Sequence, residues 1–238
     1  MYFSNYLSYL IFAAPVLILS LIAQAKVNSA YKKYSKIPNS KRITGAMAAK
    51  MILEYYGIRD VRIEPCTGKL TDHYSPNEKV IRLSQGVYNS TSVAAVGIAC
   101  HEAGHAAQHA ENYLPNTIRT ALVPVTNFGS RFGLIIAFAG YFLAYGSNTG
   151  LGFYFIIAGL ALYGLVALFQ LVTLPVEFNA SKRALSVIEG TGMMNGAEYD
   201  GAKSVLTAAA LTYVAALATA IVNLLYYALR LLGNNRRR

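Results

Sequence analysis

Residues 101–105 read His-Glu-Ala-Gly-His, so two histidines stand four positions apart and a glutamate follows the first. On a helix, positions four apart lie on one face about one turn apart, and both imidazoles can reach one ion. Glu102 then lies beside the ion, where a carboxylate can act as a base on water. Since a chance match is rare in a chain with four histidines, the motif predicts a zinc site for hydrolysis.

A catalytic zinc site needs a third protein ligand. Gln108 and Glu111 stand where the longer HExxHxxGxxH motif requires glycine and histidine, which excludes that class. His109 follows His101 by about 12 Å along a straight helix, so one ion cannot easily bind both. Glu177 is a better candidate, although a glutamate early in a helix can equally serve to complement the helix dipole.

The stabilisation of the oxyanion calls for a second electrophile near the metal. His73, Tyr74 and Arg183 are the candidates. His73 lies on an expected strand upstream of the motif, and an exposed strand histidine with no catalytic role is an equal alternative. Arg183 is better explained as the partner of a carboxylate or of a lipid headgroup. Cys100 points away from the motif face and is expected to pack in the core.

The elements that position these residues form a short polar region. The motif falls on a predicted helix from about Ser92 to Ala110, which ends before Pro115. Short runs that mix apolar with charged residues predict half-buried strands. The other expected elements are a helix over 44–56, capped by Thr44, and strands over 61–64, 69–74 and 80–83. We therefore expect a small α+β region around the motif.

Most of the remaining chain is apolar: 55% of the 238 residues are hydrophobic and 13% are charged. Residues 6–25, 132–176 and 204–229 carry no charge. The middle run would be about 67 Å long as one helix, enough to cross a bilayer twice. Turn-forming residues at 146–150 mark the break. The sequence predicts four membrane spans, the first an uncleaved anchor, since no basic residue precedes it as in a signal peptide.

The net charge of +10 does not indicate nucleic-acid binding, because the basic residues flank apolar runs and do not line one polar domain. A transporter or channel is disfavoured, since the spans contain no ionisable residue. Several lysines follow the first span, whereas residues 1–5 carry no side-chain charge. This bias predicts an outward N-terminus and a site on the cytoplasmic side. The arginines at 236–238 argue against the outward C-terminus that four spans require.

Five segments resemble the YugP-like neutral zinc metallopeptidases of bacterial membranes, over nearly the whole chain: HEAGHAAQH, LPVEFNASKRA, LTDHYSP, VAAVGIACHE and LTAAALTYVAA. The resemblance implies a multi-pass zinc peptidase of gluzincin type. It implies His101, His105 and Glu177 as the zinc ligands and Glu102 as the general base. The Glu177 segment is also similar to the ExEAD stretch of HtpX-like and CAAX-prenyl proteases, but Asn179 and Ser181 replace its second glutamate and its aspartate.

Together these observations predict a mainly α, multi-pass membrane protein with about four transmembrane helices and a small α+β zincin-like region that carries the HExxH helix. The expected function is a zinc metalloendopeptidase of the cell membrane that acts on polypeptides, such as membrane or misfolded proteins. The alternative is a membrane scaffold or regulatory protein with a structural or degenerate zinc site. Structural sites usually have four protein ligands, and they need no base such as Glu102.

The expected organisation has six parts. They are an anchor helix at 1–27, a catalytic region at 28–131, a helical hairpin at 132–176, a helix with the third ligand at 177–203, a last span at 204–231 and a basic tail at 232–238.

Overall fold

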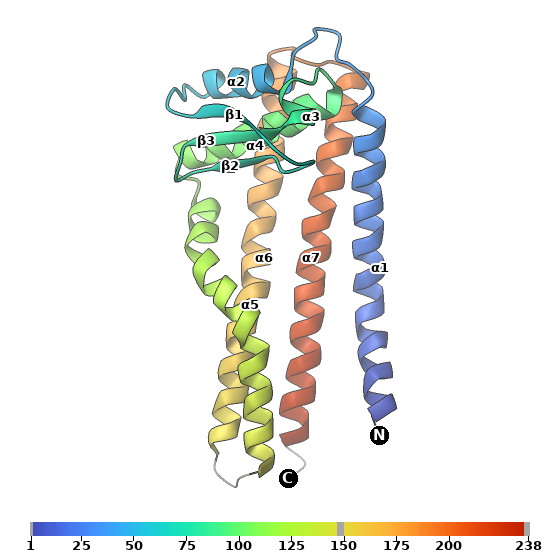
Figure 1. The fold of residues 1–238 in the computed structure, drawn as a ribbon, viewed down its shortest axis with the longest axis vertical. Coiled ribbons are helices and arrows are strands. Elements are labelled where there is room, and N and C mark those ends of the chain that lie inside the picture. Colours follow the sequence, from blue (N-terminus) through green and yellow to red (C-terminus); the bar gives the residue numbers. More distant parts are fainter. Residues whose placement is uncertain (1, 147–149, 236–238) are drawn as a thin grey trace. The chain divides into compact units, whose positions relative to one another are not determined.

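The computed structural model describes residues 2–146 and 150–235 and is mainly helical (Figure 1). The helices are α1 (Tyr2–Tyr34), α2 (Gly45–Tyr55), α3 (Gln85–Tyr88), α4 (Val93–Ala110), α5 (Leu114–Gly146), α6 (Leu151–Gly190) and α7 (Ala197–Asn235). The strands are β1 (Arg62–Cys66), β2 (His73–Ser75) and β3 (Val80–Ser84). Within these described ranges, α1, α5, α6 and α7 are long and apolar enough to cross a membrane. The predicted mainly helical fold with four membrane spans is confirmed at this level.

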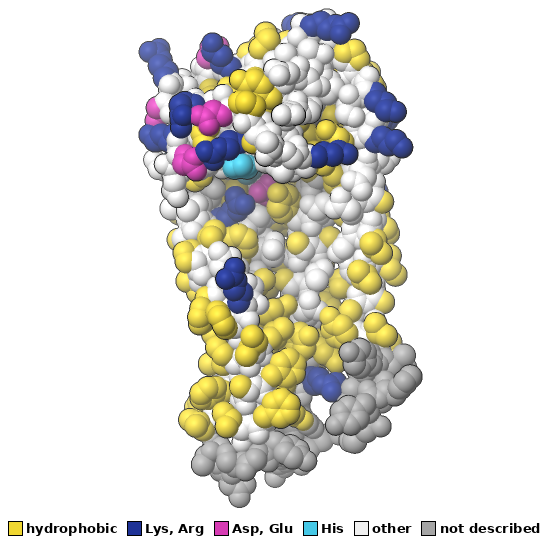
Figure 2. Space-filling view, viewed as in Figure 1, with side chains coloured by type: hydrophobic (Ala, Val, Ile, Leu, Met, Phe, Trp, Pro, Cys, Tyr) yellow, Lys and Arg dark blue, Asp and Glu magenta, His cyan; other side chains and the backbone are white. Residues whose placement is uncertain are grey.

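The chain divides into two units that share its long helices. Unit 1 comprises residues 1–22, 118–174 and 213–238, and unit 2 comprises residues 23–117 and 175–212. Unit 2 contains every aspartate and glutamate of the sequence and most of its lysines and arginines. Figure 2 shows charged side chains gathered over the strands and hydrophobic ones along the long helices. The polar chemistry of the chain is therefore concentrated in unit 2.

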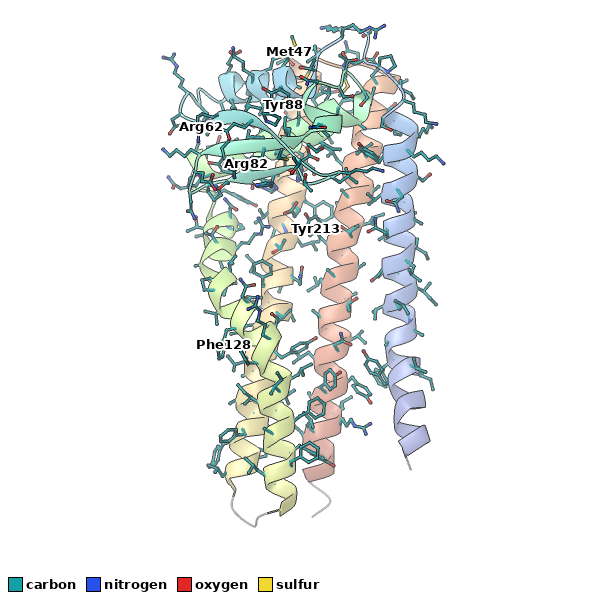
Figure 3. The ribbon with its side chains drawn as sticks, in the orientation of Figure 1. Met47, Arg62, Arg82, Tyr88, Phe128 and Tyr213 are labelled. Carbon is teal, nitrogen blue, oxygen red and sulfur yellow. The ribbon has the colours of Figure 1, made fainter. Side chains whose placement is uncertain are left out.

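Unit 1 contains a tightly packed pair of helices, α5 and α6. A Cβ atom at Gly129 would lie 2.3 Å from the carbonyl oxygen of Leu162, and one at Gly159 would lie 2.3 Å from the amide nitrogen of Ala137. Small residues that let two backbones approach this closely are typical of helix pairs in membranes. Phe128 of α5 (Figure 3) is 50% exposed, as expected of a side chain that faces lipid. The predicted hairpin break includes residues 147–149, which lie outside the described residues.

Unit 2 holds a three-stranded sheet and the helices that cover it. The strand order is β1-β3-β2, with β1 parallel and β2 antiparallel to β3. Ile81 and Leu83 of β3 are fully buried, while Arg82 between them and Arg62 of β1 carry charge at the surface (Figure 3). Four of the five residues of β3 are buried and only Arg82 is part-exposed, as expected of the central strand of this sheet. β2 is at the edge of the sheet, and its outer side has no strand partner among the described residues.

The starts of two helices lie where the sequence predicts them, whereas one strand is shorter than predicted. The hydroxyls of Thr44 and Ser92 accept hydrogen bonds from backbone amides and so cap α2 and α4, as expected. The strand predicted over 69–74 begins only at His73. Leu70 has a left-handed backbone conformation with φ of 55°, and the Asp72 carboxylate accepts a bond from the Ser84 amide at 2.7 Å. These features fix the preceding residues as a loop and shorten the strand.

Candidate metal centre

The candidate metal centre joins two helices of unit 2. His101 and His105 lie on α4, and Glu177 lies on α6. The Nε2 atoms of His101 and His105 lie 3.2 Å and 3.6 Å from the same oxygen, Oε2 of Glu177. One potential ligand atom from each residue lies within 4.8 Å of the others. The structure thus brings together the three predicted ligands, although more than seventy positions separate His105 from Glu177 in the sequence.

Gly104 makes this meeting of helices possible. A Cβ atom at this position would lie 2.6 Å from the carbonyl oxygen of Ala180, which is closer than side chains tolerate. Ala103 and Ala180 are fully buried, so the contact between α4 and α6 is built from small residues. Because the two backbones approach closely, the side chain of Glu177 is long enough to contact both imidazoles. Sequence reasoning treated Gly104 only as a variable position of the motif and missed this role.

The three side chains fit a zinc ion. A tetrahedral zinc with ligands at about 2.0–2.1 Å places neighbouring ligand atoms roughly 3.3 Å apart, close to the two measured separations from Glu177. The side chain of Glu177 is 3% exposed, and those of His101 and His105 are 15% and 12% exposed. A buried carboxylate between two imidazoles, with a remaining opening to solvent, matches the two-histidine, one-glutamate set of catalytic zinc sites.

Hydrogen bonds on the far side of each ring orient the histidines. The Nδ1 atom of His101 lies 3.0 Å from the Ser181 hydroxyl, and Nδ1 of His105 lies 3.0 Å from Oε1 of Gln108. The amide nitrogen of Gln108 donates to Val176 and to Asn179. Its Oε1 must therefore accept, so His105 carries its proton on Nδ1. This leaves Nε2 of His105 with a lone pair directed at Glu177, as metal binding requires.

A chain of polar contacts extends from Gln108 to the surface. Arg183 donates to Oδ1 of Asn179 at 2.7 Å, the same atom to which Gln108 donates, and pairs with the Glu111 carboxylate at 2.7 Å. Its guanidinium also lies over the rings of Tyr56 and Tyr113. Arg183 therefore orients a carboxylate, in agreement with the sequence interpretation, and holds the end of α4 against α6.

Glu102 lies against the sheet. Its Oε2 accepts a hydrogen bond of 3.1 Å from the backbone amide of Tyr74 on β2. The Tyr74 hydroxyl lies 2.8 Å from Nδ1 of His109, so this residue contacts α4 at two points, two turns of helix apart. Burial, followed by the charge of Asp60, raises the pKa of Tyr74, so that its hydroxyl stays protonated near neutral pH. His109 thus contacts the strand and has no place among the three clustered ligands.

His73 is less closely tied to this cluster. It is an exposed residue of β2, and its Nδ1 lies 2.8 Å from the Thr71 carbonyl oxygen. Across the described ranges, no hydrogen bond or ion pair joins it to Glu102 or to the three ligands. The structure therefore places Tyr74, and not His73, in direct contact with the helix that carries the motif.

The charges of the site act on His105. Burial acts to lower the pKa of His105, but the hydrogen bond to Glu177 and the charges of Glu102 and Glu177 more than offset it, so the pKa lies above its usual value. In the metal-free protein, Glu177 therefore favours a proton on His105. A proton and a metal ion would compete for the same nitrogen atom.

Comparison with known proteins identifies the family of this chain. The family described as "Putative neutral zinc metallopeptidase" matches residues 9–232. The chain belongs to this family. It is also 44% identical over 209 residues to the "Putative membrane protease YugP" of Bacillus subtilis (strain 168), which covers 88% of this chain and 90% of that protein. No solved structure matches. The resemblance inferred from the sequence motifs is confirmed, and the family name includes both zinc and peptidase activity.

Proposed function

We propose that this family member is a membrane zinc endopeptidase with a zincin-like catalytic region. The observation that carries the proposal is the meeting of two imidazole nitrogens and one carboxylate oxygen within 4.8 Å, beside the further carboxylate of Glu102. A purely structural zinc site would use a fourth protein ligand and no base. Within the described part of the chain, the cluster has three candidate ligands, which favours an open, catalytic site.

His101, His105 and Glu177 would hold the zinc ion. A zinc ion bound there supplies Lewis acidity, which polarises a peptide carbonyl and makes water acidic near neutral pH. Glu102 takes the proton from the attacking water and delivers it to the leaving nitrogen. The hydrogen bond from the Tyr74 amide holds the Glu102 carboxylate in place.

The open edge of β2 would bind the substrate. The Tyr74 amide points to Glu102, and hence away from β3. Since the N–H and C=O of one strand residue point to the same side, the Tyr74 carbonyl also faces the open edge. An extended peptide that pairs with this edge would have its backbone next to the proposed base. Main-chain pairing of this kind accepts varied side chains, which suits a polypeptide substrate.

The oxyanion would be stabilised by a residue of β2. His73 and Tyr74 are both candidates from the sequence, and Tyr74 is the one whose backbone contacts the proposed base, Glu102. The two candidates lead to different expected effects of substitution. If Tyr74 is the electrophile, Tyr74→Phe lowers kcat by roughly 10²-fold while His73→Ala has little effect, and the reverse holds if His73 acts.

The active site would face the cytoplasm. Unit 2 contains the lysines that follow the apolar run of α1, and its basic residues outnumber its acidic ones. An excess of lysine and arginine near the ends of spans favours the cytoplasmic side. A reporter fused after Arg238 should therefore be active outside, and activity only in the cytoplasm would overturn either the orientation or the number of spans.

Purified protein in detergent tests the function. We expect one zinc per chain and cleavage of unfolded casein by the wild type. Glu102→Gln should keep the zinc and lose cleavage, because the base is not a ligand, and Glu177→Ala should lose both. Zinc retained at full stoichiometry in Glu177→Ala would remove this residue from the ligand set. Zinc binding without any cleavage by the wild type would favour a membrane scaffold.

A further inference from the structure

A second polar site lies in unit 2, in a groove between α6 and α7 with a volume of about 360 Å³. None of the three proposed zinc ligands lines it, and neither does Glu102. At 100° per residue, Lys182 is rotated about 140° around α6 from Glu177, so this lysine lies on a different side of the helix from the proposed ligand. Ser181 lines the groove and also contacts Nδ1 of His101, so the groove borders the metal centre but contains none of its proposed ligands.

The groove combines cationic, hydroxyl and apolar side chains. Lys182 of α6 and Lys203 of α7 both line it, one from each helix, and both are exposed. In the described part of the chain, neither lysine pairs with an acidic side chain. Ser186 and Thr207 add exposed hydroxyls to the lining. Two such ammonium groups, one from each helix, with hydroxyl groups in the same lining, favour a ligand that carries a phosphate.

The apolar lining extends from this polar centre toward the membrane-spanning parts of the same helices. Phe178, which is 46% exposed, lines the groove next to the uncharged run of α6, and Ala210 lines it within the uncharged run of α7. Glu189 lines the opposite end, about two turns of helix beyond Lys182. A ligand with a phosphate near the lysines and a hydrocarbon part near Phe178 would match this arrangement of charged and apolar side chains.

We propose that the groove binds one anionic phospholipid, with its phosphate between Lys182 and Lys203 and its acyl chains running along Phe178. Basic pockets between helices at the edge of the bilayer bind lipid headgroups in this manner. The site lies where the uncharged runs of α6 and α7 meet charged sequence, which is the level expected of headgroups. The proposal concerns binding and does not depend on catalysis at the metal centre.

Native mass spectrometry tests the proposal with the full chain in detergent and with added phosphatidylglycerol or phosphatidylcholine. We expect one phosphatidylglycerol to be retained by the wild type and phosphatidylcholine to be retained far less. Lys182→Gln together with Lys203→Gln should weaken phosphatidylglycerol binding about 30-fold, or roughly fivefold for each lysine. Phe178→Ala should weaken it further, since the acyl chains lose their contact.

The matched control replaces two other exposed lysines, Lys26→Gln with Lys32→Gln, on α1 just beyond its apolar run. This variant has the same net charge as the groove variant and should retain phosphatidylglycerol. Equal losses in the two double variants would show general electrostatic attraction and would overturn the site. Displacement of the lipid by millimolar inorganic phosphate would show an anion site without lipid recognition and would also overturn it. Zinc content measured in each variant confirms that unit 2 remains folded.

Discussion

Gln108 should contribute to metal binding although it is not one of the three clustered ligands. It is fully buried, accepts a hydrogen bond from His105 at 3.0 Å, and donates to Val176 at 2.7 Å and to Asn179 at 3.0 Å. Gln108→Leu keeps the approximate volume and removes all three bonds. Loss of a partner that orients a metal-binding histidine costs about 10–100-fold in metal affinity.

The same substitution should also destabilise the fold. It leaves Nδ1 of His105 without its partner, whereas the carbonyl of Val176 keeps its bond within helix α6 and Asn179 keeps its bond from Arg183. An unsatisfied buried group costs about 1–3 kcal/mol, so the metal-free protein should lose roughly that amount of stability. Zinc affinity is measured by competition with a coloured chelator, and stability by the unfolding temperature after chelation. The exposed Gln85→Leu provides the matched control.

Gln108→Glu separates orientation from packing. A carboxylate can still accept the proton of His105 and makes that ring a stronger ligand, so zinc affinity should be kept or increased. It cannot donate to Val176 or Asn179, and it adds a buried charge, so the metal-free protein should still be destabilised. If Gln108→Leu binds zinc as tightly as the wild type, the inferred tautomer of His105 has no energetic role and the reasoning fails.

Three further expectations concern packing, thiols and pH. Gly104→Ala should lower the stability by about 1–3 kcal/mol or more and weaken zinc binding, because the added methyl group meets the backbone of α6; unchanged affinity in a chelator titration would contradict this. Burial raises the pKa of the Cys100 thiol, so a maleimide should add once to the folded chain, at the part-exposed Cys66, and twice after denaturation, as counted by mass spectrometry. Because the pKa of His105 is raised in the fold, the stability that it contributes to the metal-free protein is complete below about pH 6.5 and is lost as the pH rises through the raised value. The unfolding temperature should fall over that range without zinc, while zinc affinity rises.

The sequence was sufficient for features that depend on local pattern. The spacing of His101 and His105, the caps Thr44 and Ser92, and the uncharged runs each follow from periodicity or from hydrogen bonding within a few residues. The role of Glu177 was different, since spacing alone left a helix-dipole role equally open, and only family resemblance selected it. Its place beside the imidazoles depends on a tertiary contact that no local pattern encodes.

Other features of the site depend on the packing of α4 against α6. A glycine within an HExxH motif gives no signal of a backbone contact, and Gly104 acquires its meaning only from Ala180 on the other helix. Gln108 was used in the sequence argument only to exclude a longer motif, yet it orients His105. The strand predicted over 69–74 is shorter for a similar reason. The side chain of Asp72 accepts a hydrogen bond from the amide of Ser84 on β3, and this contact favours a loop before His73.

The charge of the site explains why its orienting partners are neutral. Glu177 and Glu102 together carry two negative charges, which would balance the two positive charges of a bound zinc ion. Ser181 lies where the similar ExEAD stretch has an aspartate, and it contacts His101 through a hydroxyl. A carboxylate at that position would leave a largely buried site with a net negative charge, which is costly to desolvate. A hydroxyl and an amide orient both rings and keep this balance, so the departure from the related stretch is consistent with a working metal centre.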